Sequence, residues 1–295
     1  MMKTRAAAVL AAILLGLSTL AATPAAAAST TGATYVAVGD SIAAGNGLLP
    51  YLDEGCLRST RSYPELLAKD LGVAVVSAAC SGATTGDVMG QVEKLARSGD
   101  LGPATELVTL TVGINDTAWR DALIVCSNAP LPDAPPCDAA LALVEQMIAA
   151  GLSERIAAVI ALIHASAPNA QIVVTGYPLP FGDTDRTCRL GVLGPQLPGA
   201  HAPLSFDAIA TAAINDTAGT LNDAIATAVG SSDVADAQYV DVNAEGFDGH
   251  GLCDSGSRWM TGFLPVTART AEGSFHPNAA GQTGYAEIIA AALGG

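Results

Sequence analysis

The sequence predicts a three-layer α/β fold in which helices cover both faces of a mostly parallel central sheet. Short runs that are almost purely apolar alternate along the chain with longer segments that have helical spacing. Strands without a polar face must be covered on both sides, which is typical of a parallel sheet between helices. No internal repeat or break in composition interrupts residues 29–295, so we expect one domain there.

The first half of the chain supplies three expected strands and two helices. Residues 34–41 are β-branched and apolar and end in a Gly-Asp-Ser turn, which predicts the first strand. Residues 62–72 have helical spacing and stop at a glycine, and 73–80 read as a second buried strand. A second helix is expected at 84–99, again closed by glycine, and a third strand at 107–116.

The second half continues the alternation. An Ala-rich helical stretch is expected over roughly 138–167, followed by a strand at 171–178. A further helix fits 205–229, a strand fits 238–242, and a last helix runs from about 277 to 293. In open sheets of this kind, binding sites gather at the carboxyl ends of the strands.

Residues 1–28 have the pattern of a secretory signal peptide. Lys3 and Arg5 precede an apolar run over 6–22, and Ala26–Ala28 form a small-residue cleavage site. A retained membrane anchor is the alternative, but this run is short for a spanning helix and is interrupted by Gly and polar residues. We therefore expect a secreted protein without stable membrane insertion.

The composition of the chain argues against nucleic acid as a partner. The 295 residues carry 13 Lys and Arg against 28 Asp and Glu, a formal net charge of −15. Such a chain is repelled by phosphate backbones, so we expect no nucleic-acid binding. A secreted domain with internal cross-links is expected to be a monomer.

Six cysteines behind an export signal predict disulfide bonds. Six cysteines allow about 15 connectivities, and the sequence does not choose among them. The spacings favour sequential pairing, Cys56–Cys80, Cys126–Cys137 and Cys188–Cys253. A zinc site is the alternative, but the chain has no C-x-x-C and no His at ligand spacing to a Cys, so no metal is expected.

Four short segments at strand ends or before the last helix carry candidate chemistry. Ser41 follows the first strand, Gly82 the second and Asn115 the third, while His276 precedes the final helix. A serine at such a turn needs a base, for which His276 is the candidate. It also needs donors for an oxyanion, and the Gly82 N–H and the Asn115 amide are the candidates. Each motif alone is weak, and their joint order and placement support a hydrolase.

These residues, together with segments such as 78–87, 108–116, 239–253 and 274–286, resemble the GDSL or SGNH hydrolase superfamily, above all its secreted, disulfide-bonded actinobacterial branch. The resemblance implies a flavodoxin-like α/β/α sandwich and hydrolysis of carboxylic esters without a cofactor. It implies that Ser41 is the nucleophile and His276 its base. The oxyanion donors would be the Ser41 N–H, the Gly82 N–H and the Asn115 side chain.

The sequence departs from this family at two positions. Many relatives carry Asp three residues before the histidine, where this chain has Gly273, with Glu272 one residue further away. We expect the backbone carbonyl of Ser274 to orient His276, and Glu272 is the alternative. Ile114 stands where relatives often have Gly, so it either narrows a substrate pocket or merely packs.

The leading hypothesis is a secreted esterase or lipase that acts on a small-molecule or lipid ester. A phospholipase and a carbohydrate acetyl esterase are alternatives on the same fold, and an exported binding module without activity is a third. The aromatic content of 4% favours an apolar acyl cleft over an aromatic sugar platform. Retention of all four motif residues argues against a pure binding module.

Overall fold

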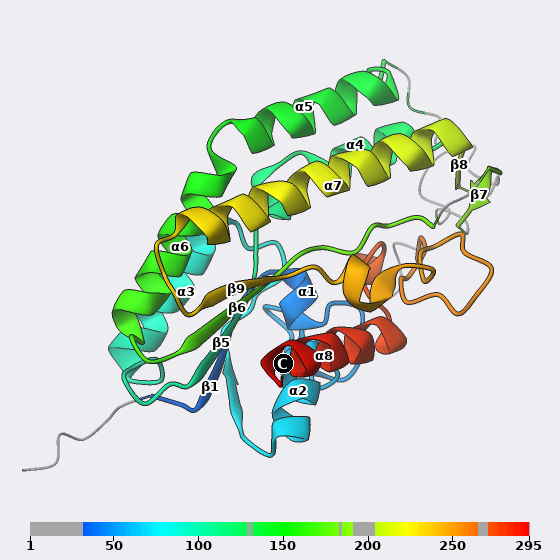
Figure 1. The fold of residues 1–295 in the computed structure, drawn as a ribbon. Coiled ribbons are helices and arrows are strands. Elements are labelled where there is room, and N and C mark those ends of the chain that lie inside the picture. The colour runs from blue at the N-terminus through cyan, green and yellow to red at the C-terminus, as the bar shows by residue number, and fades with distance from the viewer. Residues whose placement is uncertain are drawn as a thin grey trace, which may run out of the picture.

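The computed structural model describes residues 32–128, 131, 133–182, 185–190, 204–264 and 271–294. The signal peptide expected at 1–28 lies outside this part of the chain. Five parallel strands form the central sheet (Figure 1). They are β1 (Tyr35–Gly39), β4 (Val75–Ser77), β5 (Leu107–Thr111), β6 (Gln171–Thr175) and β9 (Ala237–Val240). Their spatial order is β4-β1-β5-β6-β9, the flavodoxin-like order, which confirms the predicted fold class.

Helices cover both faces of the sheet, as Figure 1 shows. One layer consists of α3 (Thr85–Ser98), α6 (Leu152–Ser166) and α7 (Ala208–Ser231). The opposite layer pairs α2 (Tyr63–Leu71) with α8 (Ala279–Leu293). The helices α4 (Trp119–Cys126) and α5 (Cys137–Ala149) pack together, and α5 also packs on α7.

The sequence explains where these elements begin and end. All residues of β1 and β5 are buried, as expected for strands covered on two faces. A capping box between Thr84 and Asp87 starts α3, since each side chain accepts a hydrogen bond from the other residue's backbone N–H. Gly99 ends this helix with a left-handed backbone, φ +81°.

The helical stretch expected over 138–167 is two helices. Gly151 has a left-handed backbone (φ +88°) between α5 and α6, whose axes differ by 45°. Within the described ranges, no single helix is long and apolar enough to cross a membrane, although this bent pair reaches the required length jointly.

Several small elements were not expected from the sequence. Two short antiparallel pairs lie outside the sheet, β2 (Tyr51–Asp53) with β3 (Arg58–Ser59) and β7 (Cys188–Arg189) with β8 (Ser205–Phe206). Short turns of helix are α1 (Ser41–Ala44), η1 (Ile114–Asp116), η2 (Asn243–Phe247) and η3 (Ala271–Gly273).

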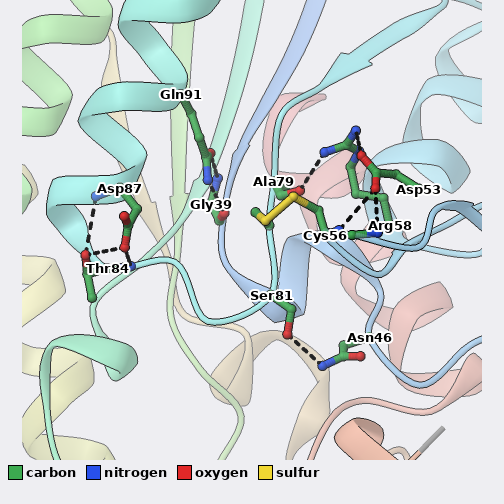
Figure 2. Close-up of a disulfide and its surroundings, with 12 residues drawn as sticks. Gly39, Asn46, Asp53, Cys56, Arg58, Ala79, Ser81, Thr84, Asp87 and Gln91 are labelled. Atoms are coloured by element: carbon green, nitrogen blue, oxygen red, sulfur yellow. Dashed lines mark hydrogen bonds and ion pairs between the residues drawn. A yellow bond between two sulfur atoms is a disulfide. The ribbon is translucent and has the colours of Figure 1, made fainter. Parts of the chain in front are cut away.

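Three disulfides join Cys56 to Cys80, Cys126 to Cys137 and Cys188 to Cys253, the pairs favoured by the spacings. The first connects the segment before β3 to the loop that follows β4 (Figure 2). The second closes the Pro-rich segment between α4 and α5. Cys80 of the first disulfide directly precedes Ser81 and lies two residues before Gly82.

Candidate active site

Gly39 ends β1 at the edge of the sheet where the candidate residues gather. A Cβ on this residue would clash with the carbonyl oxygen of Thr111 on β5, so only glycine fits this close approach. The side-chain amide of Gln91, on α3, bonds both the N–H and the carbonyl of Gly39 at 2.9 Å (Figure 2). The chain is thus held firmly before it turns through Asp40 into α1, whose first residue is Ser41.

Ser41 and His276 form a hydrogen-bonded pair across 235 positions of sequence. The hydroxyl of Ser41 lies 2.7 Å from Nε2 of His276, and Nδ1 lies 2.9 Å from the carbonyl oxygen of Ser274. Because a carbonyl only accepts, Nδ1 carries the proton and Nε2 is free to accept from Ser41. Burial lowers the pKa of His276 below its ordinary value of 6.5, which keeps the ring neutral and able to take a proton.

A left-handed residue and two backbone hydrogen bonds fix the loop that carries His276. Phe275 has φ +61°, a left-handed conformation that is uncommon for a bulky residue. Its N–H donates to the carbonyl of Thr261 at 2.9 Å, and the Thr261 N–H donates to the carbonyl of His276 at 2.8 Å. The Phe275 ring packs edge-on against Phe263 and Phe206.

Glu272, the alternative partner for the histidine, points elsewhere. Its carboxylate is 57% exposed and lies 3.8 Å from the guanidinium of Arg120. Among the described residues, the hydrogen-bond partner of Nδ1 is the Ser274 carbonyl. The Ser274 carbonyl therefore lies at Nδ1 of His276, and the Glu272 carboxylate does not.

The loops after β4 and β5, which carry Gly82 and Asn115, are hydrogen-bonded to each other. Gly82 has φ +80°, which favours glycine. The Asn115 amide donates to the carbonyl of Ala83 at 3.1 Å and has a second hydrogen left for another acceptor. Within the described part of the chain, no hydrogen bond satisfies the N–H of Ser41 or of Gly82.

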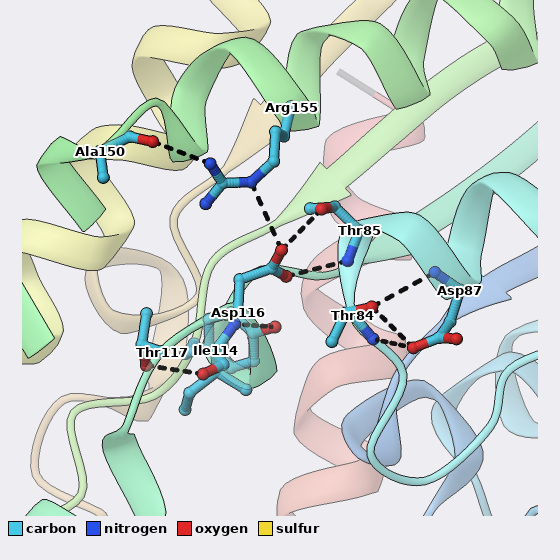
Figure 3. Close-up of polar contacts among 9 residues, drawn as sticks. Thr84, Thr85, Asp87, Ile114, Asp116, Thr117, Ala150 and Arg155 are labelled. Carbon is cyan, nitrogen blue, oxygen red and sulfur yellow. Dashed lines mark hydrogen bonds and ion pairs between the residues drawn. The ribbon is translucent and has the colours of Figure 1, made fainter. Parts of the chain in front are cut away.

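Asp116 fixes the Asn115 turn to the start of α3. Its carboxylate accepts from the N–H of Thr85 at 2.9 Å and from the Thr85 hydroxyl at 2.6 Å (Figure 3). Arg155, on α6, adds an ion pair at 3.5 Å. These contacts hold η1 against the Gly82 loop.

Asn46 is a site residue that the sequence analysis missed. Its N–H donates to the carbonyl of Ser41 at 3.1 Å. Its buried side-chain amide donates to the Ser81 hydroxyl at 3.0 Å (Figure 2). The same amide donates to the Glu272 carbonyl at 3.1 Å. This single residue joins the Ser41 turn, the Gly82 loop and the His276 loop. Its partner in η3 is 226 positions away, so no local pattern identifies it.

Asp40 stabilises the turn that carries Ser41 through hydrogen bonds to both of its carboxylate oxygens. Its side chain is fully buried and accepts the N–H of Ile42 at 3.0 Å, which caps α1. Its second oxygen accepts the hydroxyl of Tyr177 at 2.5 Å. Removal from water raises the pKa of Asp40 to about 7.

A small apolar pocket opens beside the Ser41–His276 pair. Its lining includes the residues that directly follow Ser41 and precede Asn115 and His276, namely Ile42, Ile114 and Phe275. Trp119, Met260 and Leu221 contribute to the remaining wall. The cavity volume is only about 30 Å³, far below the roughly 300–1,000 Å³ of pockets that hold drug-sized ligands.

A parallel α/β sheet that presents a Ser–His pair at its strand ends, with unpaired backbone N–H groups nearby, is typical of serine-dependent hydrolases. The chain belongs to the GDSL-like lipase/acylhydrolase family, a family of carboxylic-ester hydrolases, which it matches over residues 37–283.

Named relatives agree with this assignment. The chain is 35% identical over 262 residues to a lipase of Streptomyces rimosus, covering 86% of this chain and 85% of that one. The crystal structure of the extracellular lipase from S. rimosus superposes with a TM-score of 0.68 at 33% identity, covering 88% of this chain and 98% of that one. Phospholipase A1 from Streptomyces albidoflavus NA297 superposes with a TM-score of 0.69 at 31% identity, covering 89% and 99%.

Proposed function

We propose that this protein is a secreted esterase or lipase that cleaves acyl esters through a covalent intermediate on Ser41. The observation that carries the proposal is the 2.7 Å hydrogen bond between Ser41 Oγ and His276 Nε2. The three disulfides and the similarity to an extracellular lipase support secretion. The expected domain 29–295 and the signal peptide at 1–28 belong to the same proposal.

In the first half of the reaction, Nε2 of His276 takes the proton from Ser41 as Oγ attacks the ester carbonyl carbon. The carbonyl oxygen becomes an oxyanion, and the C–O bond to the alcohol then breaks. The imidazolium gives its proton to the departing alkoxide, which leaves the acyl group on Ser41. The Ser274 carbonyl holds the Nδ1–H of His276 throughout.

In the second half, water attacks the acyl-serine carbonyl carbon and gives its proton to Nε2. The bond to Ser41 breaks, Oγ recovers the proton from His276, and the carboxylic acid is released. We propose that the N–H groups of Ser41 and Gly82, with the free hydrogen of the Asn115 amide, stabilise the oxyanion in both halves. Their lack of partners among the described residues supports this role.

The apolar pocket supports an acyl chain as the group bound next to Ser41. Ile42, Ile114 and Phe275 are the chain neighbours of the three groups that would surround the reacting carbonyl. A phospholipase is the second candidate, favoured by the similarity to the S. albidoflavus phospholipase A1. Both candidates use the same chemistry and differ in the alcohol that leaves.

The test is hydrolysis of p-nitrophenyl esters from acetyl to palmitoyl by the protein lacking residues 1–28. Ser41→Ala and His276→Ala are expected to lose activity by a factor of about 10⁴ or more. Comparison of triacylglycerol with phosphatidylcholine then separates a lipase from a phospholipase. Full activity in Ser41→Ala would overturn the nucleophile assignment.

A further inference from the structure

Tyr177 connects the turn before Ser41 to the turn before Asn115 through one hydroxyl group. It donates to the carboxylate of Asp40 at 2.5 Å and accepts the N–H of Ile114 at 3.2 Å. A phenol hydroxyl has one hydrogen and lone pairs, so it can make both bonds at once. Asp40 directly precedes the candidate nucleophile, and Ile114 directly precedes the candidate oxyanion donor.

The backbone of Tyr177 is held from two other elements. Asn222, on α7, accepts its N–H at 2.8 Å and donates to its carbonyl at 2.9 Å. Asn243, in η2 after β9, donates to the same carbonyl at 2.9 Å. The hydroxyl is therefore attached to a fixed point of the scaffold just past the end of β6.

The bond between Tyr177 and Asp40 is buried, which makes its loss costly. Tyr177 is 2% exposed and Asp40 is fully buried. Among the described residues, the ion pairs include no basic side chain at Asp40. A buried polar group without a partner carries its full desolvation penalty, so removal of the hydroxyl is costly at the fully buried Asp40 Oδ2 and also takes the acceptor from the partly buried Ile114 N–H.

We infer that Tyr177 is a positioning residue that fixes the distance between Ser41 and the oxyanion-binding amide of Asn115 by bridging Asp40 and the Ile114 N–H. This inference rests on the proposed function, because it assigns Tyr177 to the same reaction. Tyr177 is among the residues that line the apolar pocket, but its hydroxyl is bonded to Asp40 and to the Ile114 N–H, and through this bridge it acts on Asn115. Displacement of an oxyanion donor weakens the transition state more than the ground state, so kcat falls while KM changes little.

The test compares Tyr177→Phe with Tyr285→Phe on p-nitrophenyl acetate. Both variants remove a buried tyrosine hydroxyl, but Tyr285 donates only to the Gly176 carbonyl at 2.9 Å in the described structure. We expect a drop in kcat of about tenfold or more for Tyr177→Phe, because full loss of an oxyanion donor costs about 10²–10³. Tyr285→Phe is expected to lower Tm and to keep kcat.

A double-mutant cycle with Asn115→Ala gives the decisive readout. If Tyr177 acts through Asn115, Tyr177→Phe lowers kcat little in the Asn115→Ala background. An equal fold loss in both backgrounds, or an unchanged kcat in the single variant, overturns the inference. Ser41→Ala run beside it tests the proposed function separately, since an active Ser41→Ala variant defeats that proposal instead.

Asp40→Asn serves if Tyr177→Phe does not fold. It keeps an acceptor for the Ile42 N–H and places the amide nitrogen, a donor, opposite the Tyr177 hydroxyl, which loses its acceptor. A kcat loss that disappears in the Asn115→Ala background supports the bridge, and an additive loss contradicts it.

Discussion

The side-chain amide of Gln282 donates a hydrogen bond to the carbonyl of Ile42 at 3.0 Å. Gln282 lies on α8, directly after the His276 loop, and Ile42 lies next to Ser41. The same side chain accepts the N–H of Tyr63, on α2, at 2.6 Å, and it is fully buried. The helix that follows the candidate base is thus bonded directly to the helix that carries the candidate nucleophile.

Replacement of Gln282 by Leu is expected to destabilise the protein and slow the reaction. The apolar side chain leaves the Tyr63 N–H and the Ile42 carbonyl buried without partners, at a cost of about 2 kcal/mol or more. Urea denaturation measures the free energy of unfolding, and p-nitrophenyl acetate hydrolysis measures kcat. Thr283→Ala, on the exposed side of the same turn, is the control and should change stability by about 0.5 kcal/mol or less. Equal stability of the two variants would contradict the role of Gln282.

The pH dependence of kcat/KM is expected to have its acidic limb below pH 6.5. Burial lowers the pKa of His276, so the neutral ring that accepts the Ser41 proton persists to lower pH than in a free histidine. Activity is present above this pKa and is lost as pH falls through it. A pH series of kcat/KM from 4 to 8 reports the pKa in the free enzyme.

Glu272→Gln separates the two possible partners of the histidine. The charge of Glu272 raises the pKa of His276, opposed by Arg120, so its removal should move the acidic limb to lower pH. We expect kcat at pH 8 to change by about twofold or less, because the carboxylate is 57% exposed and its interactions are screened. A loss as deep as that in His276→Ala would show that Glu272, and not the Ser274 carbonyl, sustains the base.

Ile114→Ala is expected to shift preference toward longer acyl chains. Ile114 lines the pocket next to Ser41, and the enclosed volume of about 30 Å³ leaves no room for a long chain without movement of side chains. Removal of three carbons should raise the octanoate-to-acetate ratio of kcat/KM by about tenfold. Leu143→Ala, at a 49% exposed position on α5, is the control. An unchanged ratio would mean that Ile114 only packs.

Loss of the Cys56–Cys80 disulfide is expected to lower kcat as well as stability. This bond lies beside Ser81 and Gly82, while Cys126–Cys137 closes a loop between α4 and α5. Replacement of both cysteines of either pair by Ala should cost about 2–4 kcal/mol. Assayed well below Tm, only the Cys56/Cys80 variant should lose turnover. Similar kcat values in both variants would show that this disulfide does not hold the Gly82 loop in the geometry that the reaction needs.

Much of the fold follows from local patterns. The apolar runs predict all five strands of the sheet, and glycines mark the ends of α2 and α3. The spatial order of the strands is not local information, since it depends on which helices cover which face. The division of 138–167 was missed because periodicity continues across Gly151, whose left-handed backbone ends one helix before the next begins.

The residues of the candidate site also fall into a group that local patterns predict and a group that they do not. Ser41, Gly82, Asn115 and His276 stand out because each lies in a short motif at a strand or helix end. The residues that hold those motifs together, such as Asn46, Tyr177 and Gln282, form their contacts across 35 to 240 positions. An amide or phenol inside an apolar segment signals a buried hydrogen bond, but it does not identify the partner.

Four uncharged amide side chains form hydrogen bonds to residues that position the candidate site. Gln91 bonds Gly39, Asn46 bonds Ser81, Asn222 bonds Tyr177 and Gln282 bonds Ile42. Amides do not titrate, and dissolved ions screen them far less than they screen charge pairs. These four contacts are therefore insensitive to acidity and salinity, whereas His276 responds to proton concentration. These four parts of the scaffold around Ser41 therefore keep their shape in media of widely varying ionic content, while the protonation of His276 limits the pH range of the reaction.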